Sequence, residues 1–429
     1  MKKRILAVAL AAILAVGLLA AMTVHAGDTV KIGYVNPTTG PLAGNGEGAQ
    51  WSYEKIVNWV NENGGIEVDG EQKQIEVILY DCESDQNKAS ELTQKLIEED
   101  GIDIMIAIQT PEVVIPVSIV AERYEMPCVA IQAPVNPLAD TLADAYGGDI
   151  EWVYHAFWTI ENVYEAHKAL WTAAGYGPGE GYKVGIAFAS NADGTAWHNI
   201  FTERLPEDGY VCVDPGQYPE GTTDYTNIVN KFKEENIDIL AGTNIPPDFL
   251  NLYKQLIAAG VELGCLTMGK CCLLPGDVNV LENDTPGLAQ GIMTEVWWTP
   301  DYPFASSITG ITAAELGADY KADNGGDMPQ PAGYAYASIE IAIDALRRAG
   351  TTDAEALRDA LAETDLDTVV GPIKYDKEMK GLHYGDTVIA GGQWQLQEDG
   401  TEKLVVIDNS LYDIIPVAGE YVPGNATNK

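Results

Sequence analysis

Residues 30–49, VKIGYVNPTTGPLAGNGEGA, join a short apolar run to a loop rich in glycine, proline and threonine. The run at 30–35 consists largely of aliphatic and aromatic residues, which is typical of a buried β-strand. A helical pattern begins at about residue 47, where the loop ends. A strand followed by a loop and a helix is the first unit of a parallel α/β sheet.

Strands and helices alternate in the same way along most of the chain. Further strand-like runs lie at 74–80, 103–108, 127–131, 183–189, 210–213, 238–242, 264–269 and 291–298. Amphipathic helical patterns separate them at about 86–99, 112–124, 193–205, 223–235 and 247–259. Near-continuous apolar strands between helices are typical of parallel sheets that are covered on both faces. The length exceeds what one core usually serves, so we predict an α/β fold with two doubly wound parallel-sheet lobes.

The order of the elements also predicts how the two lobes are joined. Helical patterns at 305–322, 332–349 and 353–362 have no strands between them, which favours packing against the first lobe. We therefore expect lobe 1 at 27–152 and 298–368, and lobe 2 at 153–297 and 369–429. The chain would then form a three-segment hinge near 150–158, 293–300 and 366–373. A ligand site is expected in the cleft between the lobes, at the strand ends.

The first 26 residues have the pattern of a secretory signal peptide. Lys2, Lys3 and Arg4 precede an apolar run that ends in small residues, with cleavage expected after Ala26. No cysteine follows directly, so we expect no lipid anchor at the mature terminus. No later stretch approaches the length of a membrane span, so we expect an exported, periplasmic protein without direct membrane insertion.

Composition excludes several classes of function. The formal net charge of −39 makes nucleic acid an unfavourable partner. The chain has no Cys-x-x-Cys and no His-Glu-x-x-His motif, so no metal site or cofactor is expected. Cys265 with Cys271 or Cys272 could close a small loop, and the sequence leaves the pairing of the six cysteines open.

The chain resembles a known family at both ends. The stretch at 30–49 and the stretch TVVGPIKYDKEMKG at 368–381 are similar to those of the periplasmic leucine/isoleucine/valine-binding proteins, the type I substrate-binding proteins of ABC importers. The resemblance covers essentially the whole mature chain, in order. It implies two lobes that close around a small molecule, and a permease in the inner membrane that recognises the closed form.

The resemblance also implies where a ligand is held. In amino-acid-binding members, two first-lobe loops bind the carboxylate and a second-lobe acid binds the ammonium. The first loop falls at 109–112, where Gln109 and Thr110 open a helix with free N–H groups. The second falls at 131–134, where Gln132 is a candidate contact and Pro134 replaces the threonine that this loop usually carries. The acid position falls at Lys270, a cation that would repel an ammonium and attract a carboxylate.

Further candidate ligand contacts come from the loops and from the hinge. Asn45 lies at the tip of the first loop, and Asp193 and Asn244 follow second-lobe strands. Asp193 could equally serve as a helix cap. Aromatic residues cluster where the chain crosses between lobes, and they belong either to the core or to an apolar wall of the cleft. The candidates among them are Trp152, Tyr154, Trp158 and Trp297.

These residues favour a solute receptor of an ABC importer that binds an aromatic or bulky carboxylate. Binding of a branched-chain amino acid or an amide, or ligand sensing for a signalling partner on the same fold, are alternatives. A secreted enzyme is less favoured, because the chain has no G-x-S-x-G elbow, P-loop or metal triad.

Overall fold

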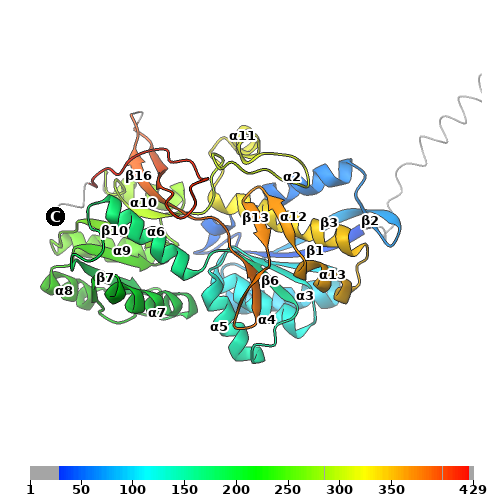
Figure 1. The fold of residues 1–429 in the computed structure, drawn as a ribbon, viewed down its shortest axis with the longest axis horizontal. Coiled ribbons are helices and arrows are strands. Elements are labelled where there is room, and N and C mark those ends of the chain that lie inside the picture. The colour runs from blue at the N-terminus through cyan, green and yellow to red at the C-terminus, as the bar shows by residue number, and fades with distance from the viewer. Residues whose placement is uncertain (1–28, 285, 399, 425–429) are drawn as a thin grey trace, which may run out of the picture.

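The computed structural model describes residues 29–284, 286–398 and 400–424. Two α/β lobes lie side by side in Figure 1, each built around one large sheet. The predicted signal peptide at 1–26 lies outside the described residues. None of the helices in the described residues is both long and apolar enough to cross a bilayer.

The first sheet has eight strands, six of them parallel. β3, β1, β4, β5, β6 and β15 run parallel in this order, and β2 and β14 add antiparallel edges. Strands β4 and β5 are buried along their whole length, which explains their continuous apolar sequence. The strands, from edge to edge, are β14 (Lys377–Met379), β15 (Leu382–Gly385), β6 (Val153–Ala156), β5 (Cys128–Ile131), β4 (Ile104–Ile108), β1 (Thr29–Asn36), β3 (Glu71–Asp81) and β2 (Ile66–Val68).

The second sheet has seven strands and the same central order. β8, β7, β9, β10 and β11 are parallel, and β16 and β17 continue the sheet in antiparallel pairing. The strands are β17 (Glu402–Asp408), β16 (Ala390–Leu396), β11 (Met293–Val296), β10 (Cys265–Gly269), β9 (Ile239–Thr243), β7 (Lys183–Phe188) and β8 (Val211–Val213). In each lobe the strand order reverses beside the first strand, which is where open α/β sheets form ligand crevices.

Helices cover both sheets. Those packed in the first lobe are α2 (Ala49–Glu62), α3 (Gln86–Lys95), α4 (Pro111–Arg123), α5 (Val135–Tyr146), α11 (Ala313–Asn324), α12 (Gln330–Ala349) and α13 (Ala354–Ala362). Those of the second lobe are α6 (Ile160–Ala173), α7 (Ala192–Glu207), α8 (Thr226–Glu235), α9 (Pro246–Ala258) and α10 (Pro275–Asp284). Short turns at η1 (Ala43–Gly46) and η2 (Leu96–Asp100) and a hairpin of β12 (Asp365–Thr368) with β13 (Gly371–Lys374) complete the description.

The predicted fold class is confirmed, but strand pairing differs from the predicted lobe boundaries. β6 pairs with β5, and β15 pairs with β6, so 153–156 and 382–385 lie in the first sheet although they were assigned to the second lobe. The chain therefore passes between the sheets at 157–159, 297–299 and 386–389, which we call the first, second and third connecting segments. The third crossing was expected near 366–373. The prediction missed it because, before the chain crosses, the β12–β13 hairpin packs against the first lobe and β15 joins the first sheet.

All six cysteines are free thiols in the structure, so the small loop that the sequence left open is not closed.

Candidate ligand-binding site

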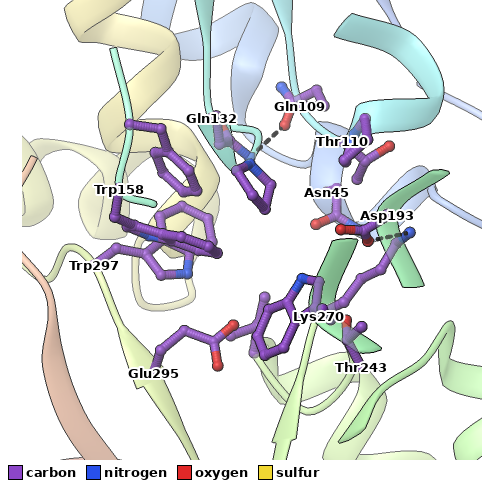
Figure 2. Close-up of a pocket in the computed structure, with 15 residues that line it drawn as sticks. Asn45, Gln109, Thr110, Gln132, Trp158, Asp193, Thr243, Lys270, Glu295 and Trp297 are labelled. Carbon is purple, nitrogen blue, oxygen red and sulfur yellow. Dashed lines mark hydrogen bonds and ion pairs between the residues drawn. The ribbon is translucent and has the colours of Figure 1, made fainter. Parts of the chain in front are cut away.

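A pocket lies between the lobes, at the carboxyl ends of the parallel strands (Figure 2). Its cavity volume is about 40 Å³, which leaves room for only a few water molecules. An organic ligand therefore requires the lobes or the lining side chains to move. The lining residues are Asn45, Gln109, Thr110, Pro111, Gln132, Pro134, Phe157, Trp158, Asp193, Trp197, Thr243, Lys270, Leu273, Glu295 and Trp297.

Three lining residues adopt left-handed backbone conformations directly after a strand. Gln109 follows β4 with φ 96°, Gln132 follows β5 with φ 63°, and Lys270 follows β10 with φ 67°. Non-glycine residues rarely adopt such conformations, which cost about 1–3 kcal/mol each and cluster at functional sites. The strained loops of both lobes thus meet at this pocket.

Lys270 forms ion pairs with carboxylates from both lobes. Its Nζ lies 2.5 Å from Oε1 of Glu112, in the first turn of α4, and 3.2 Å from Oδ2 of Asp193, in the first turn of α7. The three side chains are 9%, 8% and 5% exposed, respectively. Burial alone would lower the pKa of Lys270, but Glu112 and Asp193 outweigh it and raise this pKa. Burial would raise the pKa of Glu112, but Lys270 outweighs it and holds this pKa below its usual value.

The sequence predicted that Lys270 would attract a ligand carboxylate, but in the structure two protein carboxylates already pair with it. The sequence placed Lys270 in a loop but did not show that two acids from distant elements converge on it. Asp193 is not the N-cap of α7, because the capping side chain is that of Asn191. Burial raises the pKa of Asp193 although Lys270 opposes this, and its Oδ1 has no hydrogen-bond partner among the described residues.

Aromatic rings form one wall of the pocket. Phe157 lies 4.3 Å from Trp158 and 5.4 Å from Trp297, measured between ring centroids. Trp197 stands perpendicular to Trp158 across 6.4 Å. The indole N–H groups of Trp158 and Trp297 have no hydrogen-bond partner within the described part of the chain. Buried donors are rarely left unpaired, so these groups can donate to a ligand.

Amide side chains organise the first-lobe loops. Gln109 Nε2 donates to Asn36 Oδ1 at 3.0 Å, and Gln132 Nε2 donates to Gln109 Oε1 at 2.7 Å. This chain of bonds assigns Oε1 of Gln132 as an acceptor that no described residue occupies.

Glu295 is a pocket residue that the sequence analysis missed. It lies on β11, is 1% exposed, and its Oε2 lies 3.1 Å from His167 Nε2 and accepts from Thr294 Oγ1 at 3.2 Å. Figure 2 shows its carboxylate directed into the pocket from below the aromatic wall. A carboxylate within an otherwise apolar buried strand was the available signal.

The structure brings most of the predicted site residues together. Those that line the pocket are Asn45, Gln109, Thr110, Gln132, Trp158, Asp193, Lys270 and Trp297. Their role in ligand binding stays a prediction.

Three predicted residues lie elsewhere. Trp152 stacks with the guanidinium of Arg358, and Tyr154 packs against Tyr375. Side chains on and just before β6 enter the layers that cover the sheet, so only residues beyond its carboxyl end reach the pocket. Asn244 turns its amide to the carbonyl of Ala187, and Thr243 lines the pocket in its place.

The residues that the structure describes contain no group of His, Cys, Asp and Glu that could hold a metal ion.

Comparison with known proteins gives a family match over residues 29–394, to periplasmic binding proteins. The Leu/Ile/Val-binding protein homolog 8 of Brucella abortus (strain 2308) is 26% identical over 239 residues, which are 54% of this chain and 56% of that protein. The alignment thus spans about half of each protein.

Solved structures share the fold. A leucine binding protein from Thermotoga maritima MSB8 superposes with a TM-score of 0.70 at 17% identity, over 89% of this chain and 99% of that one. A solute binding protein of an ABC transporter from Rhodopseudomonas palustris BisB5, in complex with 3,4-dihydroxy benzoic acid, superposes with a TM-score of 0.66 at 21% identity, over 94% and 100%. The family match and the two-lobed architecture together identify this chain as a member of the type I periplasmic binding proteins.

Proposed function

We propose that this protein is the extracytoplasmic receptor of an ABC importer and that it captures a small solute by closing its two lobes. The family match, the pocket at the facing strand ends and the three connecting segments support this role. Its working partner would be a permease in the inner membrane, and the mature chain would begin after Ala26. The expected affinity is on the order of micromolar, about −8 kcal/mol.

For the ligand we propose an α-amino acid with an aromatic or bulky apolar side chain. The observation that carries this proposal is the presence of Asp193 and Glu295 in the same aromatic-lined pocket. Lys270 is already neutralised by two acids, so a ligand with only negative charge would meet unfavourable electrostatics. An ammonium would find acceptors in Asp193 and Glu295. A carboxylate would find donors in the indoles of Trp158 and Trp297 and in the hydroxyl of Thr110, which have no hydrogen-bond partner among the described residues.

A second candidate is an aromatic carboxylate without an amine. The unpartnered indole donors and flat walls of the pocket favour it. The Rhodopseudomonas protein of the same fold binds 3,4-dihydroxy benzoic acid, which supports this class as well.

Three ligands that share a phenylethyl skeleton distinguish the two candidate ligand classes. Phenylalanine carries both charged groups, 3-phenylpropionate lacks the amine, and phenethylamine lacks the carboxylate. Titration calorimetry and thermal shift with the chain lacking residues 1–26 should show binding of phenylalanine and at least tenfold weaker binding of the other two, because a charged hydrogen bond contributes about 1.5–3 kcal/mol.

Other outcomes have clear meanings. Equal or tighter binding of 3-phenylpropionate would overturn the amino-acid proposal in favour of the aromatic carboxylate. Binding of leucine in preference to phenylalanine would indicate a branched-chain specificity. Conversion of a bound ligand, followed by NMR, would contradict a receptor role.

A further inference from the structure

One side chain of the first lobe touches all three connecting segments. The ring of Tyr334 lies 5.1 Å from Phe157, in the first segment, and 5.2 Å from Trp297, in the second. Its hydroxyl donates to Oγ1 of Thr387, in the third segment, at 2.8 Å. Tyr334 is fully buried. These contacts join segments that are separated by more than 80 residues in sequence.

The helix that carries Tyr334 is anchored firmly in the first lobe. α12 packs against α2 and against the first sheet at β2, β4 and β5. At its start, Gln330 Oε1 accepts the backbone N–H of Trp297 at 2.8 Å. A Cβ added to Gly333 would stand 2.4 Å from Trp298 Cδ2, so helix and second segment touch without a gap. Tyr334 is therefore a fixed point beside segments whose dihedral angles must change when lobes move.

The same contacts reach the ligand pocket. Phe157 and Trp297, whose rings pack edge-on against Tyr334 at 81° and 76°, also line the pocket. A ligand that presses on this wall shifts rings that bear directly on Tyr334. The first segment is also bonded to the last residue of β15, directly before the third segment, where Phe157 N donates to Gly385 O at 3.2 Å.

We propose that Tyr334 is a positioning residue that couples the aromatic wall of the pocket to all three connecting segments and so sets the equilibrium between open and closed lobes. This inference rests on the lobe closure assumed in the proposed function, but not on the ligand.

Tyr334→Phe tests the proposal by removing the bond to Thr387 and a longer bond of 3.5 Å to the backbone carbonyl of Trp297. We expect amide hydrogen exchange to rise about fivefold in all three segments, as for the loss of one hydrogen bond, although no bond of 157–159 is removed. Thr387→Val should have the same effect, and the double variant should add nothing further. Small-angle scattering of the ligand-free chain lacking residues 1–26 should show a larger radius of gyration for each variant.

Tyr336→Phe is the matched control. Tyr336 lies on the same helix, is 1% exposed, and its hydroxyl is hydrogen-bonded to Thr309 at 2.9 Å, away from the connecting segments. The Tyr336→Phe variant should lose about as much free energy of unfolding in urea as Tyr334→Phe does. Its amide hydrogen exchange in the three segments should not become faster. If Tyr334→Phe changes only the second and third segments, whose hydrogen bonds it removes, or leaves the scattering unchanged, the coupling proposal is overturned and Tyr334 is a local packing residue. Because no ligand is used, this outcome is independent of the amino-acid specificity.

Discussion

Lys270 shows how one side chain can join two lobes. It extends from a second-lobe loop to a first-lobe helix and is held there by Glu112, while Asp193 on its own lobe adds a second carboxylate. A buried lysine is tolerated only when it is paired, and the net contribution of such a cluster is small. Its removal, however, leaves two buried carboxylates facing each other.

Lys270→Met should therefore open the lobes. The loss of one partner from a buried ion pair costs about 3–5 kcal/mol, and here the contact that is lost spans the cleft. We expect a larger radius of gyration in small-angle scattering. Lys321→Met is the control, because its ion pair with Asp327 is exposed on the surface. An unchanged scattering curve for Lys270→Met would show that other contacts hold the lobes together.

The same pairs predict a pH dependence of closure. The pKa of Glu112 is lowered, so its contribution is present above the ordinary glutamate pKa and is lost as the pH falls through the lowered value. The pKa of Lys270 is raised, so its contribution is present below the ordinary lysine pKa and is lost as the pH rises through the raised value. Scattering of the wild type should show closed lobes at neutral pH and opening at both extremes, a profile that Lys270→Met should lack.

Glu295→Gln tests the ammonium acceptor of the pocket. We expect about 1.5–3 kcal/mol weaker binding of phenylalanine and little change for 3-phenylpropionate, measured by calorimetry. Glu234→Gln, at an exposed position on α8, should leave the affinities for phenylalanine and 3-phenylpropionate unchanged. An equal loss for both ligands would mean that Glu295 acts through its contact with His167 rather than on the amine.

At the scale of elements, α12 carries an acid into the core of the first lobe. Glu340 is fully buried, and its Oε2 accepts the backbone N–H of Val369 at 3.0 Å beside the β12–β13 hairpin. Its Oε1 has no partner among the described residues. Burial raises the pKa of Glu340 to about 8. The helix thus holds a neutral carboxyl group at neutral pH.

Glu340→Gln should remove a pH dependence of stability. The folded protein retains a proton that the unfolded chain releases above about pH 4.5, so wild-type stability falls as the pH rises from about 4.5 to 8, by at most about 4–5 kcal/mol. Urea unfolding of Glu340→Gln should show a flatter profile across this window. Glu355→Gln, exposed on α13, should follow the wild type. Parallel profiles for Glu340→Gln and the wild type would contradict a protonated Glu340.

At the scale of the whole molecule, the two lobes have apolar cores and the chain carries a large net negative charge. The sequence carries 64 acidic and 25 basic residues. Self-repulsion of this size opposes the compact state, and salt screens it over about 10 Å at 0.1 M.

We therefore expect the melting temperature to rise with salt. Calorimetric scans should show a steady increase in the melting temperature as NaCl rises from about 0.01 to 0.5 M, because screening strengthens with ionic strength. Sodium sulfate at matched ionic strength is the control, because it screens charge to the same extent but is also excluded from the protein surface and so stabilises folded proteins in general. A decrease with NaCl would show that surface ion pairs outweigh the repulsion.

Periodicity was sufficient to predict the fold class, because a strand buried on both faces must be apolar wherever it occurs in the chain. The runs at 30–35, 103–108 and 127–131 became β1, β4 and β5 within one residue at each end. β6 was not predicted as a strand, because its Val-Tyr-His-Ala sequence lies in an aromatic stretch without clear alternation.

The loops after the strands were also foreseeable, since parallel strands present their carboxyl ends on one edge. The family resemblance assigned Gln109, Gln132 and Lys270 to the site, and each of them lies directly after such a strand. The partners of Lys270, the pocket position of Glu295 and the contacts of Tyr334 depend on residues that are far apart in the chain. Only the tertiary structure decided these, because the charge balance of a site is the sum over every group that folding brings within a few ångströms.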